Sequence, residues 1–301
     1  MYLSRRARRT FLAITCALSC AAMVPPAASA VVVGIGDQTN TLFSDPRFLA
    51  LHLHAARLTV SWNVAVSQSA AQRAELQRDT AWLKDAANAG VTPLVSFSGI
   101  GNYIPNVRQY TGAIKAFMHR FPDVRQYTPW NEPDWIYRSI SRHPLLAAAF
   151  FNAVVRSCRH CTVLAGDLYL SAGQGLGRWI KAYKKGLRFR PGGWALHNYN
   201  DVRTHKTSQL RTLMKLTSGP IWLDEISGVE RRGHWQYHNQ SAAAAGRDVK
   251  FLFSLPHRFH RVTHIYHYQW ASSTIAGWDS GLVSPSGDLR PAYNVVAAAA
   301  R

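Results

Sequence analysis

Acidic residues are scarce in this chain, and their scarcity narrows what the chain can be. Only 16 Asp and Glu stand against 35 Lys and Arg in 301 residues, which gives a formal net charge of +19. Charged residues of both signs make up only 17% of the chain and aromatic residues 11%, a composition that excludes an intrinsically disordered chain. The excess of positive charge leaves a nucleic-acid-binding protein open at this point.

Cysteine is also scarce, with four residues, which is too few for a disulfide-framework protein of this length. Cys16 and Cys20 fall in an N-terminal segment that we expect to be removed. Cys158 and Cys161 form a C-x-x-C pair, a pattern found in redox pairs, in halves of zinc sites and in small disulfides. Since there is no second pair, we favour a disulfide in a turn.

A hydrophobic run long enough for a comfortable membrane span is missing as well. Residues 1–30 instead carry the parts of a secretory signal peptide: four arginines at 5–9, an apolar stretch at 11–24 and Ala-Ser-Ala at 28–30. We expect a secreted or extracytoplasmic protein, cleaved after Ala30 and without stable membrane insertion. The Arg-Arg-Thr-Phe-Leu at 8–12 resembles a twin-arginine motif typical of bacterial export, so that route and the general one both stay open. Cleavage removes four arginines and lowers the net charge from +19 to +15.

Past residue 30 the chain alternates short β-rich runs with longer helical patterns. The first and eighth runs begin at residues 31 and 262, an average spacing of about 33 residues, which suits one strand and one helix. Several runs are almost entirely apolar, as expected of strands buried on both faces. The expected strands are 31–35, 57–62, 91–97, 125–130, 162–167, 193–199, 221–225 and 262–270.

Amphipathic segments between these runs predict helices. The clearest is 69–89, where Leu76, Trp82, Leu83 and Ala86 follow a period near 3.6 and Gly90 gives a stop signal. The others are 108–120, 145–156, 178–185, 240–253 and 291–299. The pattern predicts one domain over residues 31–301, a (β/α)8 TIM barrel, and the chain lacks the glycine-rich turn of a dinucleotide-binding fold.

Two glutamates follow expected strands at the end where such barrels keep their catalytic groups. Glu132 comes directly after the fourth strand and Glu225 ends the seventh. A pair of carboxylates facing one bond suits glycoside hydrolysis, in which one protonates the leaving oxygen and the other attacks the anomeric carbon. Asp224 is the nearest competitor, but on a strand its side chain is expected to point to the other side. A plainer alternative is that Glu132 and Pro133 only open a helix.

The Trp-Asn-Glu-Pro at 130–133 resembles the acid/base motif of the retaining glycoside hydrolases of clan A. That resemblance makes Glu132 the acid/base and Glu225 the nucleophile, and it assigns Asn131 to the sugar 2-hydroxyl. The Arg-Leu-Thr-Val-Ser-Trp at 57–62 resembles strand two of family 5, which implies that Arg57 supports the nucleophile. The third strand lacks the Asp-x-His common in family 5, and Asn-Glu-Pro-Asp is also familiar from families 39 and 128, so the resemblance implies the clan and not the family.

The same resemblance extends to the C-terminal third of the chain. The His-Asn-Tyr at 197–199 is similar to the clan's His-x-Tyr, which implies that Tyr199 contacts the nucleophile and places His197 in the site. Trp270 matches the tryptophan that ends strand eight and floors the sugar subsite. Structural roles, an ion pair for Arg57 and a core position for His197, remain the alternatives.

Tryptophans at the expected strand ends indicate sugar subsites, since sugar rings stack their C–H faces on aromatic rings. These are Trp62, Trp130, Trp270 and Trp278. Trp278 lies alone in the last loop, where a plain surface role is an equal alternative.

Four histidines near the eighth strand suggest a metal site at first, but their spacing spans a helix end and a strand, so their side chains should diverge. They are His257, His260, His264 and His267. We expect no metal and no cofactor.

The sequence therefore predicts a secreted, monomeric retaining glycosidase that acts on a polysaccharide or oligosaccharide, with β-glucan favoured. One alternative is a carbohydrate-binding barrel without catalysis, and another is a basic protein that binds a cell wall or nucleic acid. The basic residues match no nucleic-acid-binding motif, so we expect no nucleic-acid partner and assign the charge to solubility or to an anionic wall surface. The sequence does not name the sugar, the linkage or endo against exo attack.

Overall fold

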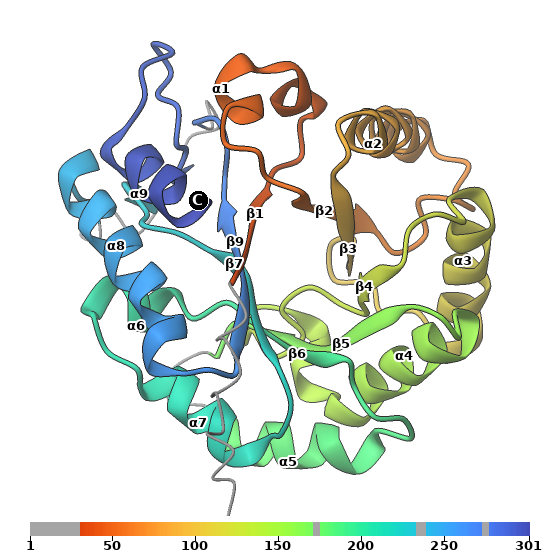
Figure 1. Cartoon of the computed structure of the whole chain (residues 1–301). Coiled ribbons are helices and arrows are strands. Elements are labelled where there is room, and N and C mark those ends of the chain that lie inside the picture. Colours follow the sequence, from red (N-terminus) through yellow and green to blue (C-terminus); the bar gives the residue numbers. More distant parts are fainter. Residues whose placement is uncertain (1–30, 171–174, 233–238, 273–276) are drawn as a thin grey trace, which may run out of the picture.

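The computed structural model describes residues 31–170, 175–232, 239–272 and 277–301. Eight parallel strands close into a barrel in the order β1-β2-β3-β4-β5-β6-β7-β9, with helices around it (Figure 1). The strands are β1 (Val32–Gly36), β2 (Ala55–Ser61), β3 (Thr92–Ser98), β4 (Gln126–Thr128), β5 (Thr162–Leu168), β6 (Gly193–Leu196), β7 (Ile221–Ile226) and β9 (Val262–Tyr268). The predicted (β/α)8 barrel is confirmed; the expected signal peptide lies outside the described residues.

The helices are α1 (Pro46–Leu49), α2 (Ala70–Asn88), α3 (Val107–Arg120), α4 (Pro144–Ser157), α5 (Leu176–Gly186), α6 (Tyr199–Thr204), α7 (Ser208–Leu216), α8 (Ala242–Arg258) and α9 (Pro291–Ala299), with 3-10 turns η1 (Asn40–Ser44) and η2 (Ser139–Arg142). The six expected helices correspond to α2, α3, α4, α5, α8 and α9, with their ends moved by a few residues. Helices α1, α6 and α7 are not among the expected ones; α1 and α6, with four and six residues, are too short to show a period. Among the described helices, none combines the length and apolarity that a membrane span needs.

Helix α2 shows how local sequence and packing agree. The Ser69 hydroxyl accepts the N–H of Gln72 and so caps the first turn, while Trp82 and Ala86 are buried against the barrel wall. Gly90 follows the helix with a φ of +67°, a left-handed conformation that glycine adopts without strain. The expected stop signal therefore ends the helix.

The barrel interior begins with a layer of six buried apolar side chains, which we call the apolar layer. Gly34 on β1 makes room for it, since a Cβ there would come within 2.6 Å of the Tyr266 ring. The layer consists of Ala55, Leu94, Leu164, Ala195, Trp222 and Tyr266. Larger apolar clusters fill the space between the barrel wall and the helices.

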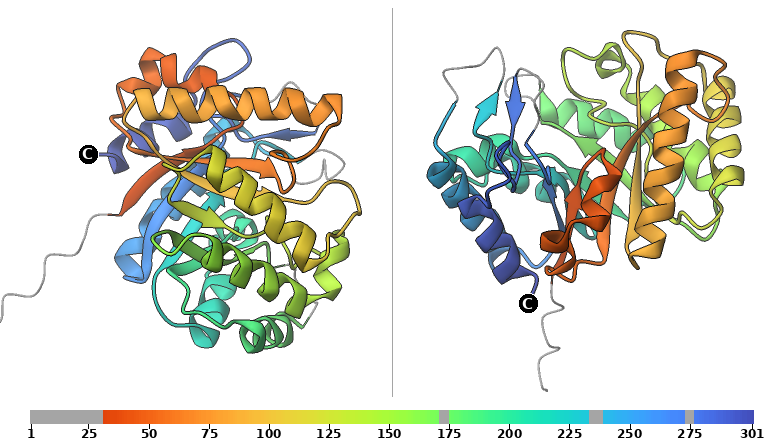
Figure 2. Two further views of the ribbon diagram at one scale, coloured as in Figure 1. Left: turned by 90° about the vertical axis from the view of Figure 1, so that its right-hand side faces the viewer. Right: turned by 90° about the horizontal axis from the view of Figure 1, so that it is seen from above.

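A second interior layer lies further along the strands and consists of fully buried polar side chains; we call it the polar layer. Its members are Arg57, Ser96, Thr128, Asp167, His197 and Asp224. The short strands β8 (Arg231–Arg232) and β10 (Trp278–Asp279) pair antiparallel and stand at the opposite end of the barrel from the start of β1 (Figure 2). The polar layer therefore lies between the apolar layer and the C-terminal ends of the barrel strands.

Cys158 and Cys161 are joined by a disulfide with a Cα–Cα distance of 5.5 Å. Cys158 caps the end of α4, and β5 begins one residue after Cys161. The bond therefore closes the tight turn between a helix and a strand.

Candidate active site

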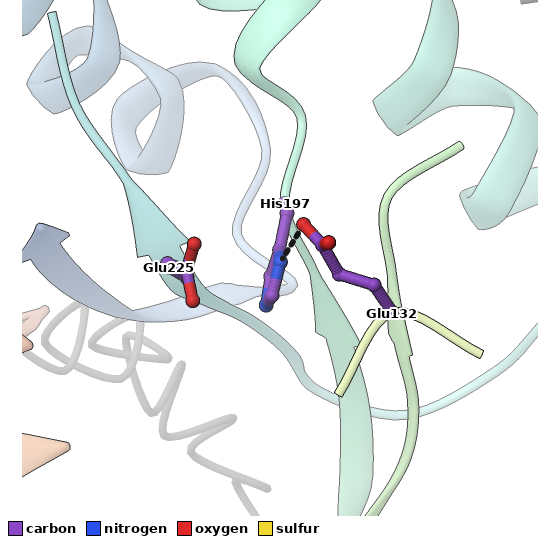
Figure 3. Close-up of side chains that lie close together, drawn as sticks. All are labelled: Glu132, His197 and Glu225. Atoms are coloured by element: carbon purple, nitrogen blue, oxygen red, sulfur yellow. Dashed lines mark hydrogen bonds and ion pairs between the residues drawn. The ribbon is translucent and has the colours of Figure 1, made fainter. Parts of the chain in front are cut away.

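A cavity of about 850 Å³ opens at the C-terminal ends of the barrel strands. Its wall includes residues at or just after the ends of seven strands: Ser61, Ser98, Glu132, Tyr169, Tyr199, Glu225 and Tyr268. Glu132 and Glu225 thus share one cavity, and His197 lies between them (Figure 3). A carboxylate oxygen of Glu132 lies within 4.8 Å of one of Glu225.

Glu132 is held by its backbone and by one ring nitrogen. Its N–H donates to the carbonyl of Asp167 at 3.0 Å, and its Oε1 lies 3.1 Å from Nδ1 of His197. Its φ of +49° is rare for a residue with a side chain, and such strain gathers at functional sites. No helix begins at Pro133, so the plainer reading of this segment as a helix start is wrong.

Glu225 at the end of β7 is held by the two residues that the clan resemblance assigns to it. Arg57 Nη1 donates to its Oε2 at 2.6 Å, and the Tyr199 hydroxyl donates to its Oε1 at 3.2 Å. Asn131 accepts from Arg57 Nη2 at 2.8 Å through its Oδ1. One buried guanidinium therefore connects Glu225 with the segment that carries Glu132.

Asp224 does not follow the simple alternation expected of it. Its Oδ2 lies 3.4 Å from Arg57 Nε, so neighbouring residues 224 and 225 both contact the same guanidinium. The pairing of β7 with β9 shifts register between Leu223 and Ile226, and this irregularity turns Glu225 toward the cavity. The expectation that the two side chains point to opposite sides is wrong for this reason, although Asp224 is fully buried and outside the cavity wall.

Asp167, which the sequence interpretation missed, is the centre of the polar layer. It accepts from Ser96 Oγ at 2.6 Å and from Thr128 Oγ1 at 2.7 Å. Its Oδ1 lies 2.6 Å from His197 Nε2 and 3.3 Å from Arg57 Nη2. The same carboxylate thus contacts the partner of Glu132 and the partner of Glu225. Its sequence signal was an acidic residue at the end of the fifth expected strand.

The charges of this cluster set its protonation. Burial opposes a charged His197, but Glu225, Asp167 and Asp224 together raise its pKa well above the ordinary value. This favours the imidazolium form, in which one ring N–H faces Glu132 and the other faces Asp167. Burial raises the pKa of Asp167, but Arg57 and His197 outweigh it and hold that pKa well below its usual range.

The pKa values of Glu132 and Asp224 are raised, in contrast to that of Asp167. Burial raises the pKa of Glu132 more than its hydrogen bond from His197 lowers it, which favours the protonated acid. Burial and the nearby Asp167 raise the pKa of Asp224 to about 7. The cluster therefore favours the neutral acid at Glu132, beside the charged Arg57 and Asp167.

Two groups of described side chains have the spacing of metal ligands, and both include His197. One is Glu132, His197 and Glu225, and the other is Asp167, His197 and Asp224. Arg57 already contacts Asp167, Asp224 and Glu225, and its own pKa is raised by them against the effect of burial. A cation would compete with this guanidinium. Within the described part of the chain, neither group includes any of the four histidines near the eighth strand.

The tryptophans expected to line sugar subsites divide into two groups. Trp278 lies in the cavity wall, with its ring 5.2 Å from that of Tyr199. Trp62, Trp130 and Trp270 are buried under the helices and are not part of that wall, so the subsite prediction is wrong for these three. Trp130 packs on Phe150, and Trp270 donates to Asp45 and packs on Phe48.

Other aromatic residues take their place. Strand β9 ends at Tyr268, two residues before the expected end, and Tyr268 lines the cavity. Trp135 lines it from the segment after β4, with its ring 5.7 Å from that of Tyr169. No local sequence pattern marks Trp135, since its position depends on the path of a loop.

Comparison with known proteins finds no matching protein-family model and no matching curated sequence. Solved structures are similar in fold at low identity. A family 39 glycoside hydrolase from Bacteroides cellulosilyticus WH2 matches with TM-score 0.60 and 14% identity, over 91% of this chain and 64% of that one. This chain thus spans slightly less than two thirds of that protein.

Two further structures cover the other families that the sequence resembles. A GH5_18 protein from Streptomyces cattleya, in complex with GlcNAc, matches with TM-score 0.62 and 14% identity, over 90% of this chain and 80% of that one. A GH128 endo-beta-1,3-glucanase from Amycolatopsis mediterranei, in complex with laminaripentaose, matches with TM-score 0.57 and 14% identity, over 90% of this chain and all (100%) of that one. The fold neighbours therefore fall in families 5, 39 and 128, as the sequence resemblance indicated.

Proposed function

We propose that this protein is a retaining O-glycoside hydrolase in which Glu132 is the acid/base and Glu225 the nucleophile. The observation that carries the proposal is the approach of their carboxylate oxygens to within 4.8 Å in one cavity. Retaining enzymes hold their carboxyl groups about 5–5.5 Å apart, whereas inverting enzymes need about 6.5–9.5 Å to admit a water molecule. The separation therefore favours double displacement.

The two carboxyl groups have the environments that their roles require. Burial raises the pKa of Glu132, so it carries the proton that the leaving oxygen must receive. Glu225 faces Arg57 at 2.6 Å and Tyr199 at 3.2 Å, which compensate and orient a negative charge. Since Asn131 Oδ1 accepts from Arg57, its Nδ2 is the group left to donate to a sugar hydroxyl.

The reaction proceeds in two steps. Glu225 attacks the anomeric carbon while Glu132 transfers its proton to the glycosidic oxygen, which leaves with the bond's electron pair. A covalent glycosyl ester on Glu225 results. Glu132, now a carboxylate, removes a proton from a water molecule that attacks the same carbon and releases Glu225.

The substrate that we propose is a β-linked glucan or a related β-glycan. Support comes from the fold neighbours, one of which is described as an endo-beta-1,3-glucanase in complex with laminaripentaose. Trp135, Trp278 and Tyr268 in the cavity wall offer aromatic faces for sugar rings. We also propose that residues 1–30 direct export, so that the enzyme acts outside the cytoplasm; N-terminal sequencing of the exported protein should begin at Val31.

Release of reducing sugar from a panel of β-glucans tests the proposed activity. We expect wild type to be active, and Glu132→Gln and Glu225→Gln each to lose about 10³-fold or more in kcat. Glu230→Gln is the matched control, because Glu230 lies outside the cavity wall and pairs with Arg290 at 3.2 Å. Unchanged activity in either active-site variant would refute its role, and glycan binding without release would indicate a carbohydrate-binding barrel.

A further inference from the structure

Three arginines line the cavity, and they come from three separate parts of the fold. Arg78 lies on α2, Arg138 follows the Glu132 segment, and Arg203 lies on α6. Across the residues that the structure describes, none of the three has a carboxylate within 4.0 Å. These three positive charges therefore line the cavity without an ion pair to any of the described residues.

Arg138 is positioned by an aromatic neighbour. Its guanidinium carbon lies 5.1 Å from the centre of the Trp135 ring, and both side chains belong to the cavity wall. A guanidinium stacked on an indole loses little further freedom when it binds a carboxylate or sulfate. The pair thus offers a stacking face and an anion-binding group side by side.

The distribution of acidic residues strengthens the positive charge of the exterior. Nine of the 16 acidic side chains are buried: Asp37, Asp79, Glu132, Asp134, Asp167, Asp201, Asp224, Asp248 and Asp279. Among the Lys and Arg side chains that the structure describes, only Arg57 is buried. The fold therefore buries more than half of its acids, whereas every Lys and Arg side chain that the structure describes, except Arg57, is at least partly exposed.

Besides Glu132 and Glu225, two carboxyl groups in the cavity wall lie on the same helix as Arg78, and they limit what Arg78 contributes. Glu75 accepts the N–H of Ser61 at 2.7 Å, and Asp79 is buried beside it. Burial and Glu75 raise the pKa of Asp79 to about 7, so part of this negative charge is absent at neutral pH. Arg138 and Arg203 do not lie on this helix, and the proposal rests on them.

We propose that the substrate is a β-glycan bearing anionic groups, carboxylate or sulfate, and that Arg138 and Arg203 bind those groups. This inference rests on the proposed glycosidase function and deepens it. Planar guanidinium groups bind carboxylate and sulfate through paired hydrogen bonds, which gives both orientation and charge recognition. The aromatic side chains contact the sugar rings, and the arginines select the substituents.

Binding to matched oligosaccharides tests the proposal without turnover. The Glu225→Gln enzyme is titrated calorimetrically with cellohexaose, with its C6-oxidised form and with its 6-O-sulfated form, and with the same three forms of laminarihexaose. We expect at least one anionic form to bind about tenfold or more tightly than its neutral parent, with affinity that falls as salt rises. The oxidised and sulfated arms identify which anion is recognised.

Arginine variants made in the same background show whether the cavity is responsible. Arg138→Gln and Arg203→Gln should each weaken binding of the preferred anionic chain about five- to tenfold and leave neutral chains unchanged. Arg108→Gln is the matched control, since Arg108 is exposed on α3 and outside the cavity wall. Loss shared equally by neutral and anionic chains, or no preference for any anionic form, overturns the proposal. Tighter binding of a single-stranded DNA oligonucleotide than of every oligosaccharide also overturns it.

Wild-type hydrolysis of the same six oligosaccharides separates this proposal from the proposed activity. Hydrolysis of neutral and anionic chains with equal kcat/KM keeps the glycosidase and refutes the anionic substrate. Arginine-dependent binding of anionic chains with no hydrolysis of any chain keeps the anion site and refutes the glycosidase.

Discussion

The two layers inside the barrel are built by the same strands and have opposite chemistry. Residues two positions apart on one strand face the interior together, and in four cases the first is apolar and the second polar. These pairs are Ala55 and Arg57 on β2, Leu94 and Ser96 on β3, Ala195 and His197 along β6, and Trp222 and Asp224 on β7. One step of the pleat separates the side chains that fill the barrel from those that form the site.

The difference shows that the two layers are stabilised by different interactions, apolar burial in one and charge pairing in the other. The apolar layer is stable when its side chains fill the available space and bury their apolar surface away from water. The polar layer buries charged groups, which is costly unless each is paired. Arg57 and His197 compensate Asp167, Asp224 and Glu225, so the layer depends on all its members at once.

Asp167→Asn should have the largest effect, because it removes one carboxylate charge from the centre of the polar layer. Arg57 and His197 then remain buried with less compensation, and we expect stability to fall by about 3–5 kcal/mol. The kcat/KM of the folded enzyme should fall about 10²-fold, since the partners of both glutamates lose a common anchor. Urea denaturation and steady-state kinetics measure the two effects.

The control for this change is Asp248→Asn. Asp248 is a buried carboxylate on α8 that accepts from Gln240 at 2.7 Å, away from the cavity. It should lower stability and leave kcat/KM of the folded enzyme within twofold. An equal loss of activity in both variants would show that Asp167 acts only through stability.

Leu164→Ala tests the apolar layer. Leu164 is fully buried on β5, three residues before Asp167, so truncation leaves a cavity inside the barrel. We expect a loss of about 3 kcal/mol in the free energy of unfolding. Activity of the folded fraction, measured well below the unfolding temperature, should stay within twofold. A loss of activity comparable to that of Asp167→Asn would mean that the layers are not functionally separate.

His197→Gln should move the pH dependence of the reaction. In the proposed mechanism Glu132 must be protonated to act as the acid, so activity should be present below its pKa and be lost as pH rises through it. His197 lowers that pKa by its hydrogen bond and its charge. Without it, the alkaline limb of kcat/KM should move to higher pH, alongside a lower maximum.

His264→Gln is the matched control for the pH profile. His264 stacks on Trp222 at 3.4 Å, on the apolar side of the barrel. Its replacement should leave the alkaline limb where it is. A limb that stays unchanged in His197→Gln, or moves to lower pH, would contradict the assignment of that limb to Glu132.

Asp79→Asn should have the smallest effect. Asp79 is buried, and burial and Glu75 raise its pKa to about 7 against the smaller opposing effect of Arg78. Its folded pKa exceeds the unfolded value, so stability falls as pH rises from about 4 to 7. We expect Asp79→Asn to gain stability relative to wild type as pH rises from about 4 to 8. Exposed Asp123→Asn should show no such difference, and an identical profile in both would contradict the account of Asp79.

The sequence predicted the barrel and both glutamates because strand periodicity and strand ends are local features. Asp167 ended an expected strand and was available as a signal, but its contacts depend on a register shift between Gly166 and Leu168 and on its own φ of +63°. Neither the register shift nor the positive φ can be predicted from the alternation of side chains along a strand. The same limit explains Asp224, whose neighbour Glu225 is turned by an irregularity in β7.

The aromatic residues show the other limit. Trp62 and Trp130 lie at strand ends, as expected of subsite residues, yet they face the helices and pack on Tyr110 and Phe150. A residue at a strand end faces either the barrel interior or the helices, depending on where the pairing between strands stops. The local sequence pattern does not determine that point. Trp135 and Arg138 reach the cavity from a loop, whose path is set by tertiary packing rather than by local pattern.

The stereochemistry of the first product tests the central claim most directly. The proton NMR spectrum of a β-glucan oligosaccharide is recorded during the first minutes of hydrolysis, before mutarotation mixes the anomers. The close approach of Glu132 and Glu225 predicts that the β-anomer appears first and the α-anomer only later, as retention requires. Initial appearance of the α-anomer would contradict double displacement and the nucleophilic role of Glu225.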